Sequence, residues 1–337
     1  MISTQAVQKS INIGFIGVGW IGRNRMEVLL KNDQLRATAI SEPDPGNATE
    51  ALKAAPSAFQ ARSLEEVIGN PEIDAVVIAT PSALHARQSI QALRAGKAVF
   101  CQKPLGRTAK EVREVVSAAR SADKLLGVDL SYRHTKAFGA VHEELTSGSI
   151  GDVFAVDLVF HNAYGPDKPW FYQLEQSGGG CVMDLGIHLV DLALWSLDFP
   201  EVTSVQSSLY HQGKRLEKNT DQVEDYASVN MNTEKGTQIN LQCSWNISAG
   251  QDAVIEARFY GTKGGLCFRN LEGSFYDFQA EKYEGTRTEI LVSPPDHWSG
   301  AAATHWAEKL LENSGYDAKT AEEFIKTSEI IDRIYGR

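Results

Sequence analysis

Residues 11–22 read INIGFIGVGWIG, and this stretch decides the fold. Its first half is an apolar run typical of a buried strand, and an amphipathic, helix-like stretch runs from Trp20 to Lys31. Gly17, Gly19 and Gly22 have the spacing of a dinucleotide-binding turn. In such a turn the first glycine permits a tight bend, the second lets the backbone approach a pyrophosphate, and the third allows close packing of helix on strand. We therefore expect a Rossmann-type cofactor domain.

A carboxylate stands at the end of the second expected strand. Glu42 follows the run LRATAIS, residues 35–41. At this place a carboxylate accepts hydrogen bonds from ribose hydroxyls and repels a 2′-phosphate. Residues 43–46 contain no arginine to bind that phosphate, so the pattern favours NAD over NADP. The alternative that Glu42 only belongs to a turn stays open. The predicted cofactor-binding residues of this motif are Gly17, Gly19, Trp20, Ile21, Gly22 and Glu42.

Strand-like and helix-like segments alternate up to about residue 130. The strands, for example 74–80 and 97–102, are nearly continuous apolar runs, as expected when helices cover both faces of a parallel sheet. This predicts an α/β fold whose doubly wound, Rossmann-type parallel sheet occupies residues 10–130.

The pattern changes beyond Ser131. After two helical segments, β-like runs such as 152–160 and 226–232 follow one another with turns and little helix between them. Helical periodicity returns from about Gly300 onward. We predict a second, C-terminal α+β domain over residues 131–337 with a large, mostly antiparallel open sheet.

Composition excludes several classes of partner. The net charge of -10 disfavours nucleic acid and anionic membrane surfaces. No uncharged apolar run approaches the roughly 18 residues of a membrane span, and the first ten residues lack the apolar core of a signal peptide. The four cysteines are scattered, without the paired spacing of zinc or redox motifs. We expect a cytoplasmic protein with reduced thiols.

Two further segments carry candidate chemistry. Lys103 follows a strand at the edge where open α/β sheets bind ligands, so it can polarise a substrate oxygen or take part in proton transfer. An exposed surface lysine is the competing interpretation. Asp184 and His188 follow a glycine run, and their spacing puts both on one helix face, with Asp191 a turn further along. A core histidine and a dipole-complementing aspartate are the alternatives, and a metal site lacks a clear further ligand, so none is predicted.

Taken together, these segments resemble the glucose–fructose oxidoreductase/inositol dehydrogenase/rhizopine catabolism family, called Gfo/Idh/MocA. The resemblance covers nearly the whole chain and rests on five segments in the family's order. They are GVGWIG (17–22), SEPDP (41–45), DAVVIATPSALH (74–85), AGKAVFCQKP (95–104) and SGGGCVMDLGIHLVDL (177–192).

The resemblance implies roles for single residues. Lys103 matches the lysine of the family's Glu-Lys-Pro motif, and Asp184 and His188 match its aspartate and histidine, so all three are expected to be catalytic and to face the nicotinamide. It further implies that Thr80, Pro81 and His85 border the cofactor and that Arg133 is a basic residue near the interdomain cleft, where it would contact substrate. The chain departs from the family at Gln102, where the family has glutamate; we interpret this as a subfamily variation that removes a charge.

The function expected from these matches is oxidation of a secondary hydroxyl of a sugar, sugar acid or cyclitol, with hydride transfer to NAD. His188 would accept the hydroxyl proton, Lys103 would stabilise the alkoxide, and Asp184 would orient His188 or hold a neighbouring hydroxyl. The cluster Trp170, Phe171 and Tyr172 forms either a wall for the substrate ring or part of the core.

Two other functions remain open at this stage. One is a glycosidase or oxidoreductase that keeps and recycles its NAD, and the other is a non-catalytic dinucleotide sensor. The family's open sheet implies a homodimer or homotetramer.

Overall fold

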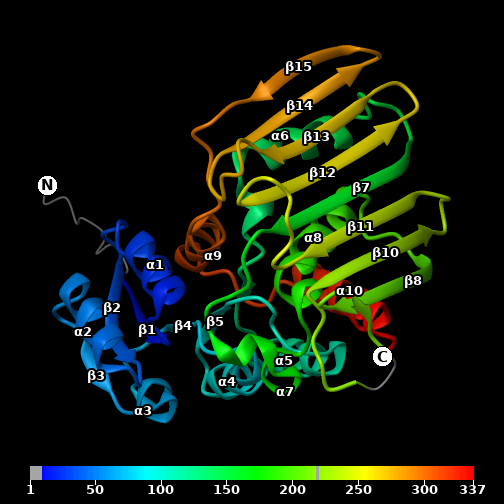
Figure 1. Ribbon diagram of the computed structural model, residues 1–337. Coiled ribbons are helices and arrows are strands. Elements are labelled where there is room, and N and C mark those ends of the chain that lie inside the picture. Colours follow the sequence, from blue (N-terminus) through cyan, green and yellow to red (C-terminus); the bar gives the residue numbers. More distant parts are fainter. Residues whose placement is uncertain (1–9, 218–219) are drawn as a thin grey trace, which may run out of the picture.

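The computed structural model describes residues 10–217 and 220–337, which form two sheets with helices around them (Figure 1). The first sheet is entirely parallel and has the order β3-β2-β1-β4-β5-β6. Its strands are β1 (Ile11–Ile16), β2 (Leu35–Ser41), β3 (Phe59–Ala61), β4 (Ala75–Ile78), β5 (Ala98–Cys101) and β6 (Leu126–Val128). Because the order reverses between β1 and β4, a ligand crevice is expected at their carboxyl ends.

Helices alternate with these strands along the chain. Local capping fixes where several of them begin: the Asp44 carboxylate accepts from Asn47 N–H, and Thr108 Oγ accepts from Glu111 N–H. The helices are α1 (Trp20–Leu29), α2 (Pro45–Ala54), α3 (Leu64–Gly69), α4 (Ser82–Arg94) and α5 (Ala109–Ala122). The doubly wound parallel sheet predicted from the sequence is confirmed.

The second sheet has nine strands in the order β15-β14-β13-β12-β7-β11-β10-β8-β9. Within the described part of this second sheet, β7 and β11 are the one parallel pair of neighbours. The other neighbouring strands are antiparallel, as predicted. The strands are β7 (Val153–Asn162), β8 (Val202–His211), β9 (Lys214–Arg215), β10 (Tyr226–Thr233), β11 (Gln238–Ser244), β12 (Ala253–Gly261), β13 (Gly265–Asn270), β14 (Phe278–Glu284) and β15 (Arg287–Val292).

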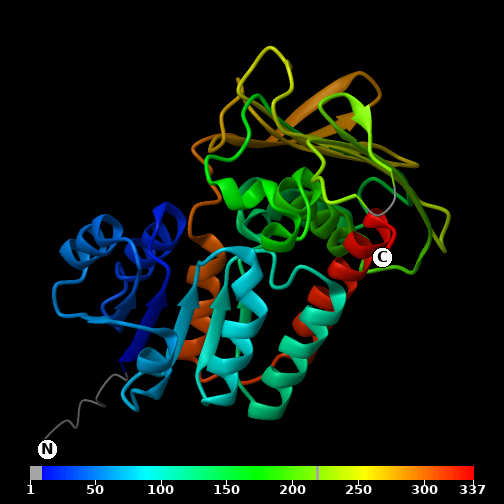
Figure 2. The ribbon, with the colours of Figure 1, turned by 60° about the horizontal axis from the view of Figure 1, so that its bottom comes forward.

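A layer of helices lies between this sheet and the first domain (Figure 2). Alternate side chains of the strands point into that layer; Ile255, Ala257 and Phe259 of β12 are fully buried there. The layer comprises the 3-10 turns η1 (Ser131–His134) and η2 (Pro169–Tyr172), the helices α6 (Lys136–Thr146) and α7 (Leu174–Ser177), the π-helical turn η3 (Val182–Gly186) and α8 (Ile187–Ser196).

The two C-terminal helices return to the first domain. Trp306 of α9 (Ala301–Leu311) packs on Phe100 of β5, and it occupies the space above Gly127, where a Cβ would meet its Cδ1 at 2.6 Å. Phe324 of α10 (Ala318–Tyr335) shares a core cluster with residues of α5. Although α9 follows the second sheet in sequence, its buried residues thus belong to a core cluster of the first sheet.

One helical stretch, Leu174–Ser196, has the length and apolar composition of a membrane span. Its most apolar 18-residue window is 89% buried within the protein, between the two sheets. Its apolarity therefore serves the core of the second domain.

Candidate active site

The turn after β1 has the backbone that a dinucleotide requires. Gly17 has φ +81°, and a Cβ there would meet the carbonyl oxygen of Ala79 at 2.7 Å. A Cβ on Gly22 would overlap the Gly17 carbonyl, so α1 packs directly against the turn. At Gly19, by contrast, the nearest atom to a Cβ would be Asn47 Nδ2 at 4.0 Å. The backbone at Gly19 therefore faces open space at the N-terminus of α1, which fits a pyrophosphate.

Glu42 lies beside this turn. Its carboxylate accepts a hydrogen bond from Val18 N–H (2.7 Å) and another from Asp44 N–H (3.0 Å). These bonds fix the carboxylate between the glycine turn and the start of α2, where the ribose next to the pyrophosphate is expected.

A cavity of about 490 Å³ continues from the glycine turn into the space between the two domains. The predicted cofactor residues Gly19, Trp20, Ile21, Thr80, Pro81, His85 and Lys103 line it. Each ring nitrogen of His85 lies 2.7 Å from a carbonyl oxygen, of Pro104 and of Thr80. His85 thereby ties the segment after β4 to the segment that carries Lys103, and its burial lowers its pKa.

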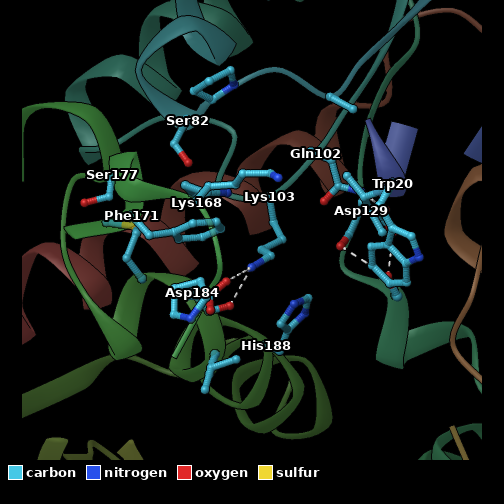
Figure 3. Close-up of a pocket in the computed structure, with 18 of the residues that line it drawn as sticks. Trp20, Ser82, Gln102, Lys103, Asp129, Lys168, Phe171, Ser177, Asp184 and His188 are labelled. Atoms are coloured by element: carbon cyan, nitrogen blue, oxygen red, sulfur yellow. Dashed lines mark hydrogen bonds and ion pairs between the residues drawn. The ribbon is translucent and has the colours of Figure 1, made fainter. Parts of the chain in front are cut away.

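Lys103 and Asp184 meet inside the cavity (Figure 3). Lys103 Nζ donates to Asp184 Oδ1 and to the Asp184 carbonyl oxygen, both at 2.6 Å. The other carboxylate oxygen, Oδ2, accepts from Trp245 Nε1–H at 3.1 Å. Both carboxylate oxygens of Asp184 are thus engaged, by Lys103 and by Trp245. A bond to His188, one of the two roles expected for Asp184, is not among the described contacts.

His188 lies next to this pair and also lines the cavity (Figure 3). Its ring packs edge-on against Tyr132, with centroids 5.0 Å apart, and its Nδ1 is buried without a hydrogen-bond partner among the described residues. Burial lowers its pKa well below the ordinary value, and the positive charges of Lys103 and Arg25 lower it further. His188 is therefore neutral at pH 7 and able to accept a proton.

A buried carboxylate holds the start of the helical segment that carries Asp184. Glu224 accepts from Gly180 N–H (3.0 Å), Val182 N–H (2.9 Å) and the Tyr335 hydroxyl (2.8 Å). A Cβ on Gly180 would overlap the backbone of Glu224, so glycine is required for this close approach. Burial raises the pKa of Glu224, while these hydrogen bonds oppose the rise. The glycine run is thus fixed in place by residues far away in the sequence.

The aromatic cluster is divided between the cavity wall and the protein surface, where Tyr172 is 43% exposed. Trp170 and Phe171 line the cavity, and their rings stack with centroids 3.8 Å apart. Tyr172 does not line it: its hydroxyl donates to the Pro166 carbonyl, and its ring packs edge-on against Trp245. Among the three, Trp170 and Phe171 are placed to contact a substrate.

Arg133 lies outside the cavity lining. Its Nε and Nη2 donate to Asp191 at 2.6 Å each, its Nη1 donates to Glu323 at 2.5 Å, and its guanidinium lies over the rings of Trp195 and Phe199. The structure therefore gives Arg133 a packing role, because its donors are directed at carboxylates within the protein and not at the cavity.

Comparison with known proteins identifies the family. A model of the oxidoreductase family with an NAD-binding Rossmann fold matches residues 11–130, and the GFO/IDH/MocA C-terminal domain matches residues 138–267. A 1,5-anhydro-D-fructose reductase from Ensifer adhaerens is 32% identical over 273 residues, covering 77% of this chain and 76% of the reductase. The chain belongs to the Gfo/Idh/MocA family. Its expected character as an NAD(P)-dependent oxidoreductase is confirmed.

Other members of the Gfo/Idh/MocA family are similar over most of the chain. An inositol 2-dehydrogenase from Rhizobium meliloti is 29% identical and covers 77% of this chain and 76% of its own length. Among solved structures, GenD2 from gentamicin A biosynthesis in complex with NAD has a TM-score of 0.80 at 21% identity, covering 100% of this chain and 98% of its own. The 3-ketoreductase KijD10 from Actinomadura kijaniata, in complex with NADP, has a TM-score of 0.81 at 20% identity, with 97% of both chains covered. These structures share the fold.

Sequence reasoning missed several residues that line the cavity of this Gfo/Idh/MocA protein. They are Arg25, Asp129, Ser131, Tyr132 and Trp298. Asp129 gave a usable signal, because it follows β6 as Glu42 follows β2, at the edge where parallel strands present ligand-binding side chains. Trp298 gave none, since its contact with α1 depends on the fold of the second domain.

Proposed function

We propose that this protein is an NAD-dependent dehydrogenase that oxidises a secondary hydroxyl of a sugar, sugar acid or cyclitol. The observation that carries the proposal is the contact of Lys103 with Asp184 beside His188, in one cavity with the glycine turn. The names of similar proteins support the substrate class, since they act on 1,5-anhydro-D-fructose, inositol and, in a relative from Escherichia coli, a D-glucoside.

The residues present fit the cofactor and the chemistry. Bound NAD would supply the acceptor for the hydride of the carbinol carbon. The substrate hydroxyl loses its proton to His188 as the carbonyl forms, and Lys103 donates a hydrogen bond to the oxygen on which negative charge develops. Asp184 holds Lys103 at that position, and Trp170 with Phe171 provides an apolar face for the carbon ring.

The preference for NAD over NADP is part of the proposal. Its support is the Glu42 carboxylate, fixed by Val18 N–H beside the glycine turn, where it would repel a 2′-phosphate. A homodimer or homotetramer and a cytoplasmic location are also proposed. Helices cover one face of the nine-stranded sheet, whereas the described residues leave the other face open, with Val254, Glu256 and Tyr260 of β12 partly exposed on it (Figure 2). Light scattering of the purified protein tests the oligomer.

The direct test is an absorbance screen for NADH or NADPH formation with aldoses, sugar acids and inositols, using NAD and NADP separately. We expect turnover with one polyol class and a clear preference for NAD. Replacing His188 with Asn should lower turnover by roughly 100- to 10,000-fold while NADH binding is kept. Near-normal turnover of that variant would refute the role of His188 as the base.

The alternatives give distinct outcomes in the same screen. Silence of the wild type together with a stoichiometric, non-dissociating cofactor would favour an enzyme that recycles bound NAD. Silence together with reversible cofactor binding would favour a dinucleotide sensor.

A further inference from the structure

Four polar side chains form a buried cluster on the cavity wall next to Lys103. Arg25 and Asp129 are each 1% exposed, Ser131 is 3% exposed and Gln102 is 8% exposed, and all four line the cavity. Polar groups so deeply buried are unfavourable unless they are paired. The pairing within the cluster therefore decides whether it is stable.

Asp129 is the acceptor for the whole cluster. Its Oδ2 accepts from Arg25 Nε at 2.6 Å and from the Gln102 amide, and its Oδ1 accepts from Ser131 Oγ at 2.5 Å. The charges of Arg25 and Asp129 balance, and the neutral amide of Gln102 adds a donor without adding a charge. A glutamate at position 102 would place a second carboxylate against Asp129, with no donor between them.

The cluster joins segments that meet at the reaction site. Gln102 directly precedes Lys103 after β5, and Asp129 follows β6 (Figure 3). Arg25 lies on α1, the helix of the cofactor turn. Arg25 also reaches the second domain, since its guanidinium lies 5.0 Å from the centre of the Trp298 ring. Asn24 extends this link by accepting from both Arg25 Nη1 (2.6 Å) and Ser299 Oγ (2.7 Å).

We infer that Asp129 is a positioning residue of the active site. Its carboxylate holds Gln102, and with it Lys103, against the cofactor helix. Residue 102 must be neutral, because Asp129 already carries the negative charge that balances Arg25. This role rests on the proposed function where turnover is the readout. The arrangement also explains the departure at Gln102: the negative charge is not lost from the cavity but is carried by the neighbouring strand.

A charge transposition tests this inference. The variants are Gln102→Glu, Asp129→Asn and the double variant Gln102→Glu/Asp129→Asn, which exchanges carboxylate and amide while keeping the net charge. Each single variant should lose at least about tenfold in kcat, with a smaller change in KM, because Lys103 acts on the oxygen that becomes charged in the transition state. The double variant should recover to within about threefold of the wild type, as expected for two directly interacting residues.

A matched control separates positioning from folding. Glu323→Gln alters another buried ion pair, with Arg133, outside the cavity lining. It should lower the urea midpoint of unfolding but keep kcat. Single variants at 102 and 129 that lose stability but keep kcat would overturn the positioning role, and so would a double variant no better than the poorer single one.

The inference can fail separately from the proposed function. If the wild type turns over no substrate of the panel, the proposed function fails, and the dissociation constant for NADH, measured by fluorescence, becomes the readout. Weakened NADH binding in both single variants with recovery in the double variant would then support the arrangement of Asp129, Gln102 and Arg25. Weakened binding without recovery would overturn it.

Discussion

One helical segment carries two aspartates that each bind a basic side chain, and the two ion pairs differ in their exposure and in their distance from the cavity. Asp184 binds Lys103, and both side chains are 16% exposed on the cavity wall. Asp191 binds Arg133, where the exposed fractions are 1% and 10%. The first pair joins the two domains at the cofactor turn, whereas the second lies beneath α10 and outside the cavity lining.

The difference lies in how completely the basic group is used. Arg133 directs its donors at Asp191 and Glu323 and lies over two aromatic rings, so its charge is neutralised by carboxylates within the protein. Lys103 can direct a donor toward a ligand in the cavity. Its ammonium has three donors, and within the described part of the chain two of them are bound, to Oδ1 and to the carbonyl oxygen of Asp184. The partly exposed pair therefore has a donor available for a ligand beside the cavity, whereas the donors of the buried pair are directed at groups within the protein.

The largest effect should follow from Lys103→Met. Methionine keeps much of the apolar stem but removes the donor that faces the reacting oxygen, so kcat should fall by roughly 100- to 10,000-fold. Steady-state kinetics and urea unfolding measure the two consequences separately. Unfolding should change little, because Asp184 is partly exposed and keeps the Trp245 bond. A large loss of stability with kcat retained would make this pair equivalent to the one at Asp191.

Arg133→Met should give the opposite result. It leaves Asp191 buried with Thr327 Oγ1, at 3.2 Å, as its one remaining side-chain donor among residues 10–217 and 220–337, and breaking a buried pair in this way destabilises by about 3–5 kcal/mol. Urea unfolding should detect this loss, while the kinetics of the folded fraction should stay close to those of the wild type. A raised KM without a loss of stability would instead restore the substrate contact that the sequence suggested for Arg133.

These two pairs also show how far sequence reasoning reaches. The glycine turn, Glu42 and Lys103 were predictable, because each lies at a fixed offset from a strand whose apolar run is visible locally. The ion pairs themselves were not, although the resemblance implies that Lys103 and Asp184 both face the nicotinamide. Asp184, which binds Lys103, lies 81 residues further along the chain, and Glu323, which binds Arg133, lies 190 residues further along. Such distances are set by how the second domain folds back on the first.

The helix α9 illustrates the same limit. Its periodicity predicts a helix but not the surface on which it packs. Trp306 lies on the first sheet because Gly127 leaves room above β6, and that fit is visible only in three dimensions. A domain boundary placed at residue 131 from the sequence therefore carries no information on where α9 packs.

The lowered pKa of His188 predicts how activity and stability each change with pH. Burial and the charges of Lys103 and Arg25 lower its pKa, so kcat/KM should hold as the pH falls through about 6.5, the ordinary pKa of histidine, and decline only below it. Stability should behave differently. Below about pH 6.5 the unfolded chain binds a proton at residue 188 that the folded protein does not, so the unfolding free energy falls with decreasing pH, by at most about 1.4 kcal/mol per pH unit.

The matched variant for this effect is His188→Asn, which removes the titrating group. Urea unfolding between pH 7.5 and 5.0 should show a shallower loss of stability in the variant than in the wild type. Equal slopes in the two proteins would mean that the pKa of His188 is the same in the folded and the unfolded chain, so that burial does not lower it.

The smallest expected effect concerns Trp245, which holds the second oxygen of Asp184. Trp245→Phe keeps an aromatic ring but removes the Nε1–H bond, so Asp184 gains freedom to rotate and kcat should fall by roughly three- to tenfold with little change in KM. Trp306→Phe is the matched control, because Trp306 Nε1 is buried without a hydrogen-bond partner among the described residues. If both variants lower kcat equally, the loss reflects packing. A loss confined to Trp245→Phe would show that the Lys103–Asp184 pair depends on a third group, because Asp184 must be held in place if the Lys103 ammonium is to move toward a ligand.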